Sequence, residues 1–205
     1  MKLSKVLFSV AMTVMMLFSV AVSASPKKLV LGFAQIGAES GWRTAETGSI
    51  KAAAKAQGIT LKFSDAQQKQ ENQIKALRSF IAQKVDVIAL APVVESGWDT
   101  VLQEAKKAKI PVIIVDRTIN VKDESLYATF VGSDFPLEGK NAAIEMAKLL
   151  NNTGNIVELQ GTVGSSAQVD RLKGFADEIA KYSNIKMLAS QSGDFTIAKG
   201  KEVME

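Results

Sequence analysis

Five side chains that suit the recognition of a sugar come soon after short apolar runs of this sequence. They are Trp42, Arg43, Asp116, Arg117 and Arg171. A sugar ring offers C–H faces, on which an aromatic ring can stack, and hydroxyl groups, which the planar forks of aspartate and arginine bind in pairs. These residue types therefore indicate a site for a small ligand rich in hydroxyl groups.

The same residues also have structural interpretations, which the sequence leaves open. Asp116 and Arg117 could pair only with each other, and Trp42 could fill the core at the start of a helix. Arg171 follows a Gly/Ser-rich loop on a predicted helix, where a solvated arginine is common. Spacing alone does not separate a binding role from these alternatives.

The composition argues against several kinds of enzyme and against a bound cofactor. The chain has no histidine and no cysteine, so zinc ligand sets and Ser-His or Cys-His nucleophile pairs cannot form. Its glycines make neither a dinucleotide-binding fingerprint nor a phosphate-binding loop. A carboxylate pair for glycoside hydrolysis, Glu39 with Asp116, stays open, but a nearby arginine favours the ionised form of each and makes it a poor general acid. We therefore expect a binding protein and not an enzyme, with no cofactor and no metal.

Apolar strands that alternate with amphipathic helices must position these residues. Strands are predicted at residues 29–34, 59–63, 85–90, 112–115 and 127–131, and helices at 41–57, 70–83, 98–108 and 137–150. This alternation is typical of an α/β fold, in which helices cover both faces of a parallel sheet. Ligands of such sheets bind beyond the carboxyl ends of the strands. The residue pairs after the first and fourth strands, at 42–43 and 116–117, should therefore meet at this edge.

The alternation begins again after a turn cluster at residues 151–154. A strand is predicted at 155–159, a helix at 167–180, a strand at 185–190 and the start of a helix at 197–205. We therefore expect an N-terminal α/β lobe at residues 25–150 and the first half of a C-terminal α/β lobe at 151–205. The last helix has no C-cap glycine or terminating proline, so we expect the chain to be a fragment.

The N-terminus has the pattern of a secretory signal peptide at residues 1–24. Lys2 and Lys5 form a basic segment, residues 6–22 are apolar, and small residues suit cleavage near Ala24. A membrane anchor is the alternative, for which the apolar run is at the short limit. We expect cleavage and a periplasmic location. Without the two lysines of this segment the formal charge falls from +4 to +2, so we expect no nucleic-acid partner.

Four segments together resemble the ribose-type periplasmic binding proteins, the substrate-binding subunits of sugar ABC transporters. They are VLGFAQ at 30–35, VDR at 115–117, ELQGT at 158–162 and SQSGDF at 190–195. Within this family, GAESGWR at 37–43 and DAQQKQENQ at 65–73 are most similar to the galactofuranose-binding members. The resemblance implies the type I fold, in which two Rossmann-like lobes with parallel sheets close over a sugar. The second lobe would be incomplete in this chain.

The resemblance also implies which residues contact the ligand. They are Glu39, Ser40, Gly41, Trp42, Arg43, Asp116, Arg117, Arg171 and Phe195. It further implies a monomer that binds a monosaccharide, with galactofuranose favoured, and delivers it to an ABC transporter permease at the inner membrane. A signalling partner that presents its ligand to a membrane receptor is the alternative on the same fold. The remaining family ligands of the second lobe would lie beyond Glu205.

Overall fold

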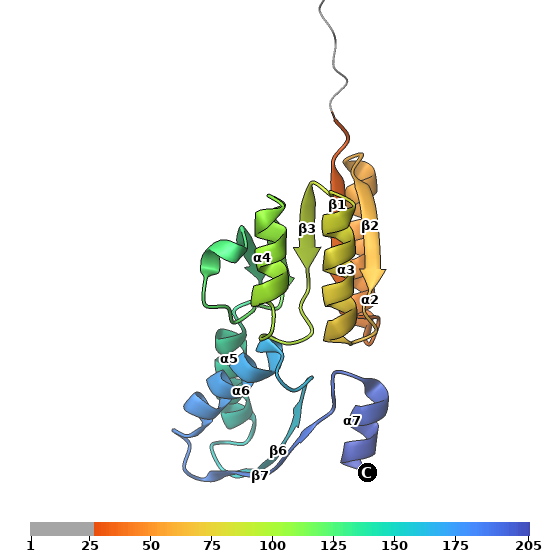
Figure 1. Cartoon of the computed structure of the whole chain (residues 1–205). Coiled ribbons are helices and arrows are strands. Elements are labelled where there is room, and N and C mark those ends of the chain that lie inside the picture. The colour runs from red at the N-terminus through yellow and green to blue at the C-terminus, as the bar shows by residue number, and fades with distance from the viewer. Residues whose placement is uncertain (1–26) are drawn as a thin grey trace, which may run out of the picture.

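The computed structural model describes residues 27–205, which form two α/β units that follow each other along the chain (Figure 1). The predicted signal peptide at 1–24 lies outside the described residues. Within the described part of the chain, no helix is both long enough and apolar enough to cross a membrane.

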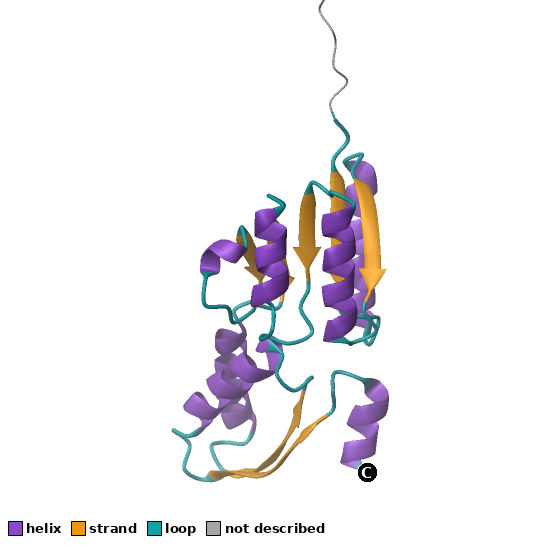
Figure 2. Ribbon diagram, in the orientation of Figure 1, coloured by secondary structure: helices purple, strands orange, loops and turns teal. Residues whose placement is uncertain are grey.

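The first unit is a parallel sheet of five strands in the order β2-β1-β3-β4-β5, with helices packed against it (Figure 2). Its strands are β1 (Val30–Gln35), β2 (Thr60–Asp65), β3 (Val87–Leu90), β4 (Val112–Asp116) and β5 (Thr129–Gly132). Its helices are α2 (Gly41–Ala56), α3 (Gln70–Ala82) and α4 (Asp99–Lys107), and a short 3-10 helix, η2 (Glu124–Leu126), precedes β5. This strand order is that of a doubly wound sheet, whose ligand crevice lies beyond the carboxyl ends of the strands.

Two hydrophobic clusters hold the helices to the two faces of this sheet. Successive residues of a strand point to opposite faces, and β1 follows this rule. Ala34 belongs to the cluster that includes α3 and α4, whereas Phe33 belongs to the other cluster, against which Ile50 of α2 packs. Because the sheet is fixed from both sides, the loops after its strands start from a rigid edge.

The second unit contains a small parallel sheet and three helices. The strands are β6 (Gly154–Gln160) and β7 (Ile185–Ser192), and the helices are α5 (Phe135–Leu149), α6 (Ser166–Ile179) and α7 (Ile197–Met204). Several large apolar side chains of the two strands are exposed, among them Val157, Leu159 and Leu188. A two-stranded sheet is marginally stable by itself. The helices α5 and α6 therefore contribute most of the packing of this unit.

The packing of α5 differs from what the sequence predicts. Periodicity assigns this helix to the first lobe, with the lobe boundary at residue 150, but in the structure α5 packs along α6. The helix begins behind its N-cap Asp134, whose carboxylate accepts a hydrogen bond from Leu137 N–H at 3.0 Å. We therefore propose that the two lobes divide near Ser133, between β5 and α5.

Two glycines allow α5 and α6 to approach each other closely. A Cβ atom on Gly139 of α5 would lie 2.1 Å from the carbonyl oxygen of Arg171, and a Cβ atom on Gly174 of α6 would lie 2.0 Å from that of Pro136. These neighbours are backbone atoms, so they cannot turn aside. Any larger side chain at either position would force the helices apart.

We expect Gly139→Ala and Gly174→Ala each to lower the free energy of unfolding by about 1–3 kcal/mol, the usual cost of overpacking. Gly48→Ala is the matched control. Gly48 also lies inside a helix, but a Cβ atom there has no neighbour within 4 Å. Alanine should therefore stabilise the protein by about 0.5–1 kcal/mol, because it loses less backbone freedom on folding than glycine. Urea denaturation followed by circular dichroism measures all three. Equal effects at the three sites would contradict the close packing of α5 and α6.

Within the described part of the chain, hydrogen bonds join loops of the first unit directly to the start of α6 and to the loop before it. Thr118 N–H donates to Ser166 Oγ at 2.9 Å, and Glu95 N–H donates to the carbonyl oxygen of Gly164 at 3.0 Å. Burial raises the pKa of Glu95, and the negative charge of Asp170 on α6 raises it further. The junction between the units therefore disfavours the charged form of the Glu95 carboxyl.

We expect Glu95→Gln to stabilise the protein at neutral pH. A carboxyl whose pKa is raised by folding destabilises the folded state above that pKa, and the penalty disappears below the pKa of the unfolded chain. The gain should therefore be present at neutral pH and absent below about pH 4. Glu124→Gln, at an exposed position of η2, is the control and should change little at either pH. Urea denaturation at the two pH values tests the sign, and a loss of stability at neutral pH would contradict it.

Candidate functional site

A cavity of about 350 Å³ lies beyond the carboxyl ends of β1 and β4, between the first unit and the helices α5 and α6. Its lining consists of Glu39, Ser40, Trp42, Arg43, Asp116, Arg117, Ser133, Phe135, Glu138, Ala167, Arg171 and Phe195. All residues that the sequence predicts for the site are among them except Gly41, which is the first residue of α2. The volume falls within the range of about 300–1,000 Å³ that is typical of small-molecule sites.

The N-terminus of α2 places the first residues of the site. Ser40 is the N-cap of this helix, and its hydroxyl oxygen accepts a hydrogen bond from Arg43 N–H at 3.2 Å. A serine at this position satisfies one of the free N–H groups of the first turn. The cap therefore fixes where the helix begins, and with it the position of Trp42 and Arg43 at the cavity.

Arg43 is buried at the centre of a group of three carboxylates. Its Nε donates to Glu39 Oε1 at 3.2 Å, its Nη2 donates to Asp116 Oδ2 at 2.8 Å, and its Nη1 donates to Glu46. Burial alone would lower the pKa of Arg43, but the charges of Asp116 and Glu46 outweigh it and raise the pKa above its ordinary value. The guanidinium is thus a permanent cation that links β4 to α2.

One carboxylate oxygen of this group has no partner. The Glu39 side chain is 2% exposed, and within residues 27–205 its Oε2 is the buried side-chain oxygen for which no hydrogen bond exists. A buried polar atom without a partner is unusual in a folded protein and calls for an explanation. Since Glu39 lines the cavity, a hydroxyl group of a ligand could donate to this oxygen.

The backbone is strained where β4 meets the cavity. Asp116 has φ of +64°, a left-handed conformation that an aspartate adopts at some cost. This turn places two successive side chains at the site. The Asp116 carboxylate pairs with Arg43, and its distance from Arg117 Nε is 3.9 Å. Asp116 and Arg117 therefore do not form the exclusive mutual pair that the sequence left open.

Arg117 is buried with few acceptors around it. Its Nη1 donates to the carbonyl oxygen of Val93 at 3.3 Å, and its guanidinium lies 5.0 Å from the ring centroid of Phe195. Burial lowers the pKa of Arg117 to about 10, and the positive charge of Arg43 adds to this effect. The side chain remains charged at neutral pH. Within residues 27–205 its guanidinium donates only to Val93, which leaves further N–H groups for the oxygens of a ligand.

Aromatic side chains and a third arginine line the mouth of the cavity. Trp42 is 58% exposed, which excludes the interpretation that it fills the core. The Arg43 guanidinium lies 4.8 Å from the Trp42 ring centroid. Arg171 donates from Nε to Glu138 at 2.8 Å and lies 4.5 Å from the ring centroid of Phe135, so it is partly exposed but held in place.

Comparison with known proteins shows the family of this chain. The family model of the periplasmic binding protein domain matches residues 31–205. The chain belongs to the periplasmic binding protein family. The resemblance to this family and the expected fold, an α/β fold of type I with parallel sheets, are thereby confirmed.

Three relatives of this periplasmic binding protein chain carry furanose ligands in their names. The galactofuranose-binding protein YtfQ of Escherichia coli (strain K12) is 60% identical over 178 residues, which are 86% of this chain and 56% of that protein. The binding protein of the arabinose ABC transporter from Shewanella sp. ANA-3, bound to α- and β-L-arabinofuranose, has a TM-score of 0.84 and 58% identity over 85% of this chain and 58% of that chain. A structure from Mycobacterium smegmatis in complex with β-D-fucofuranose has a TM-score of 0.84 and 55% identity over 86% of this chain and 59% of that chain. The chain spans a little over half the length of each.

Sequence reasoning missed several residues of the cavity wall. Ser133, Phe135 and Glu138 lie between the end of β5 and the first turn of α5. The rule that ligands bind beyond strand ends applies to β5 as it does to β1 and β4, and would have found Ser133. The position of Glu138 follows from its pairing with Arg171, which no local pattern predicts.

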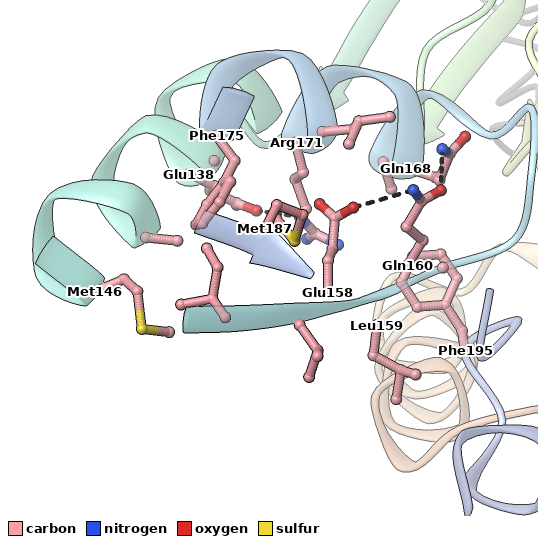
Figure 3. Close-up of a pocket in the computed structure, with 17 residues that line it drawn as sticks. Glu138, Met146, Glu158, Leu159, Gln160, Gln168, Arg171, Phe175, Met187 and Phe195 are labelled. Carbon is pink, nitrogen blue, oxygen red and sulfur yellow. Dashed lines mark hydrogen bonds and ion pairs between the residues drawn. The ribbon is translucent and has the colours of Figure 1, made fainter. Parts of the chain in front are cut away.

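A larger cavity of about 420 Å³ lies between the α5–α6 pair and the strands β6 and β7 (Figure 3). Apolar side chains such as Phe175 and Met187 line much of it. The polar groups at one end bond to one another, since Gln168 Nε2 donates to Gln160 Oε1 at 2.7 Å and Gln160 Nε2 donates to Glu158 at 3.0 Å. We therefore treat the smaller cavity as the candidate ligand site, because a carboxylate oxygen of its lining residue Glu39 lacks a partner among the described residues.

The described residues provide no evident metal centre, because residues 27–205 contain no group of three or more carboxylates that could hold an ion. The carboxylates of Glu39, Glu46 and Asp116 all pair with Arg43, whose positive charge lies among them. The contact of the predicted site residues with a ligand stays a prediction.

We expect Arg43→Met to lower the free energy of unfolding by about 3–5 kcal/mol, because it leaves buried carboxylates without their cation. Arg78→Met is the matched control. Arg78 also pairs with a carboxylate, that of Glu104, but both side chains are exposed, so its removal should cost far less. Chemical denaturation of the two variants in parallel measures the difference. Similar losses would contradict the central role of the Arg43 group.

Proposed function

We propose that this chain is part of the periplasmic substrate-binding protein of a sugar ABC transporter. The cavity between its two units takes a monosaccharide in the furanose form, and galactofuranose is the favoured ligand. Family membership supports the class of protein. The names of the three relatives, each of which includes a furanose, support the ligand class.

The observation that carries this proposal is the unpartnered oxygen of Glu39, a residue of the cavity that the exposed Trp42 also lines. Glu39 Oε2 is buried, and no donor from residues 27–205 bonds to it, so it is free to accept from a ligand hydroxyl. Trp42, on the same cavity, exposes more than half of its surface. A sugar provides a hydroxyl donor for the first and a C–H face for the second, whereas an apolar ligand would provide only the face.

Each charged group then has a distinct part in binding. Glu39 and Asp116, held by Arg43, accept from ligand hydroxyls. Arg117 and Arg171 donate to ligand oxygens from the two sides of the cavity, since they belong to the first and second units. A ligand that bridges the units stabilises their closed arrangement, as in hinge-bending binding proteins.

The same contacts argue against hydrolysis of a glycoside. A general acid must hold a proton and release it to the leaving group. Glu39 and Asp116 both accept a hydrogen bond from the Arg43 guanidinium, so each already acts as an acceptor and not as a donor. Neither is suited to be that acid, and we propose that the protein binds its sugar without changing it.

Transport is favoured over presentation to a receptor. The arabinofuranose-bound neighbour is named as a component of an ABC transporter, and it shares 58% of its aligned residues with this chain. Crosslinking in membranes tests the assignment. A permease as the captured partner supports it, whereas a sensor kinase or chemoreceptor contradicts it.

Isothermal titration of the purified protein at its full natural length tests the ligand class. We expect heat of binding with galactofuranose and L-arabinose, weaker binding with ribose, and none with a methyl galactopyranoside, which cannot open to a furanose. No heat with any of the furanose-forming sugars would exclude the proposal.

We expect Trp42→Ala to weaken sugar binding by roughly tenfold or more, the scale of an aromatic hot spot. The side chain is exposed, so the free energy of unfolding without ligand should hardly change. Trp42→Phe, which keeps a ring, should retain part of the affinity. Phe63→Ala removes an aromatic ring that lies on β2 and does not line the cavity. Titration should find the sugar affinity of the Phe63→Ala variant unchanged. A loss equal to that of Trp42→Ala would contradict the role of Trp42.

A further inference from the structure

We propose that Glu46 and Gln35, two residues that do not line the cavity, are positioning residues of the sugar site. They fix the plane of the Arg43 guanidinium, and through it the carboxylates of Glu39 and Asp116. We call this chain of side chains the Gln35–Glu46–Arg43 relay. The inference rests on the proposed function, since its effect is on the affinity for a sugar.

The relay starts at Gln35, the last residue of β1, whose side chain is fully buried. Its Oε1 accepts from Ile36 N–H at 2.8 Å, which fixes the orientation of the amide. Its Nε2 then donates to Glu46 Oε2 at 3.0 Å and to Thr47 Oγ1 at 2.9 Å. The oxygen and both donor positions of the amide are occupied, so the end of β1 sets the place of the Glu46 carboxylate.

The Glu46 carboxylate, held in place by Gln35, in turn orients the guanidinium of Arg43. The two residues are three apart on α2, so their side chains lie on the same face of the helix. Glu46 Oε2 accepts both from Gln35 and from Arg43 Nη1. Arg43 bonds with its other nitrogens to Glu39 and Asp116. Because the guanidinium is planar and its N–H groups have fixed directions, a bond at one edge determines where the other edges point.

Neutralisation of charge alone does not account for Glu46. Arg43 carries one positive charge and already bonds to Glu39 and Asp116. The carboxylates of these two residues already exceed that charge, and a third one enlarges the excess of negative charge in a largely buried place, which costs free energy. What Glu46 adds is a third hydrogen bond that fixes the orientation of the Arg43 guanidinium. Without it, the guanidinium could turn toward either of the remaining carboxylates and move the oxygens that the sugar needs.

We expect Glu46→Gln to weaken binding of the best furanose by about tenfold or more, because the buried network loses a charged acceptor. Gln35→Asn, which draws the amide back from Glu46, should act in the same direction. Glu145→Gln removes an exposed carboxylate that pairs with Lys148 on α5 and should leave the affinity within about twofold. Isothermal titration of the protein at its full natural length measures each affinity, and circular dichroism checks that each variant is folded.

The mechanism predicts a specific dependence on Arg43. In an Arg43→Lys background, the ammonium is a compact charge that cannot transmit the orientation of a plane. The effect of Glu46→Gln on affinity should therefore shrink to about twofold or less, a coupling that a double-mutant cycle measures. A general loss of structure would instead weaken binding by the same factor in both backgrounds.

The outcomes separate this inference from the proposed function. If the wild-type protein binds no furanose, the proposed function fails, and the relay fails with it. If the wild-type protein binds and Glu46→Gln binds within twofold of it, the relay alone is overturned. An equal loss in the arginine and lysine backgrounds also overturns the relay. A large loss that depends on Arg43 supports it.

Discussion

The site of this protein depends on one buried cation. The guanidinium of Arg43 bonds to carboxylates that come from three places: Glu39 in the loop after β1, Glu46 on α2 and Asp116 at the end of β4. Buried like charges repel unless an opposite charge lies between them. The cation therefore offsets the repulsion between acceptors that are drawn together around it. The parallel sheet contributes to this by bringing the ends of β1 and β4 to one edge.

The two units contribute to the cavity in different ways. The first unit has a sheet whose two faces are covered by buried clusters, and its side of the cavity is a preformed network with little freedom. The second unit contributes Arg171 and Phe195 from α6 and from the loop before α7. Its small sheet leaves apolar side chains exposed. The Arg43 network is thus built on the well-packed unit, and the partly packed unit supplies the facing wall with the Arg171–Glu138 pair.

Local patterns in the sequence were enough to predict most helices and strands to within a few residues, because apolar periodicity reports directly on which side of an element is buried. The rule that ligands bind beyond strand ends also predicts that Trp42, Arg43 and Asp116 meet, and all three line one cavity. The sequence could not tell which helix α5 packs against, since that depends on the close contact at Gly139 and Gly174. Nor could the sequence predict that Arg43 and Arg117 have different surroundings. Arg43 and Arg117 differ in the number of carboxylates within reach, and this follows from backbone turns such as the positive φ of Asp116.

The contrast between the two tryptophans of this chain has a practical consequence. Trp98 is wholly buried, and its indole N–H donates to the carbonyl oxygen of Val94 at 2.7 Å. Trp42 is at the mouth of the cavity and meets solvent. The polarity around an indole sets its emission wavelength, so the two rings should emit at separable wavelengths. The protein therefore contains its own optical probe, in which Trp98 serves as an internal reference and Trp42 responds to whatever enters the cavity.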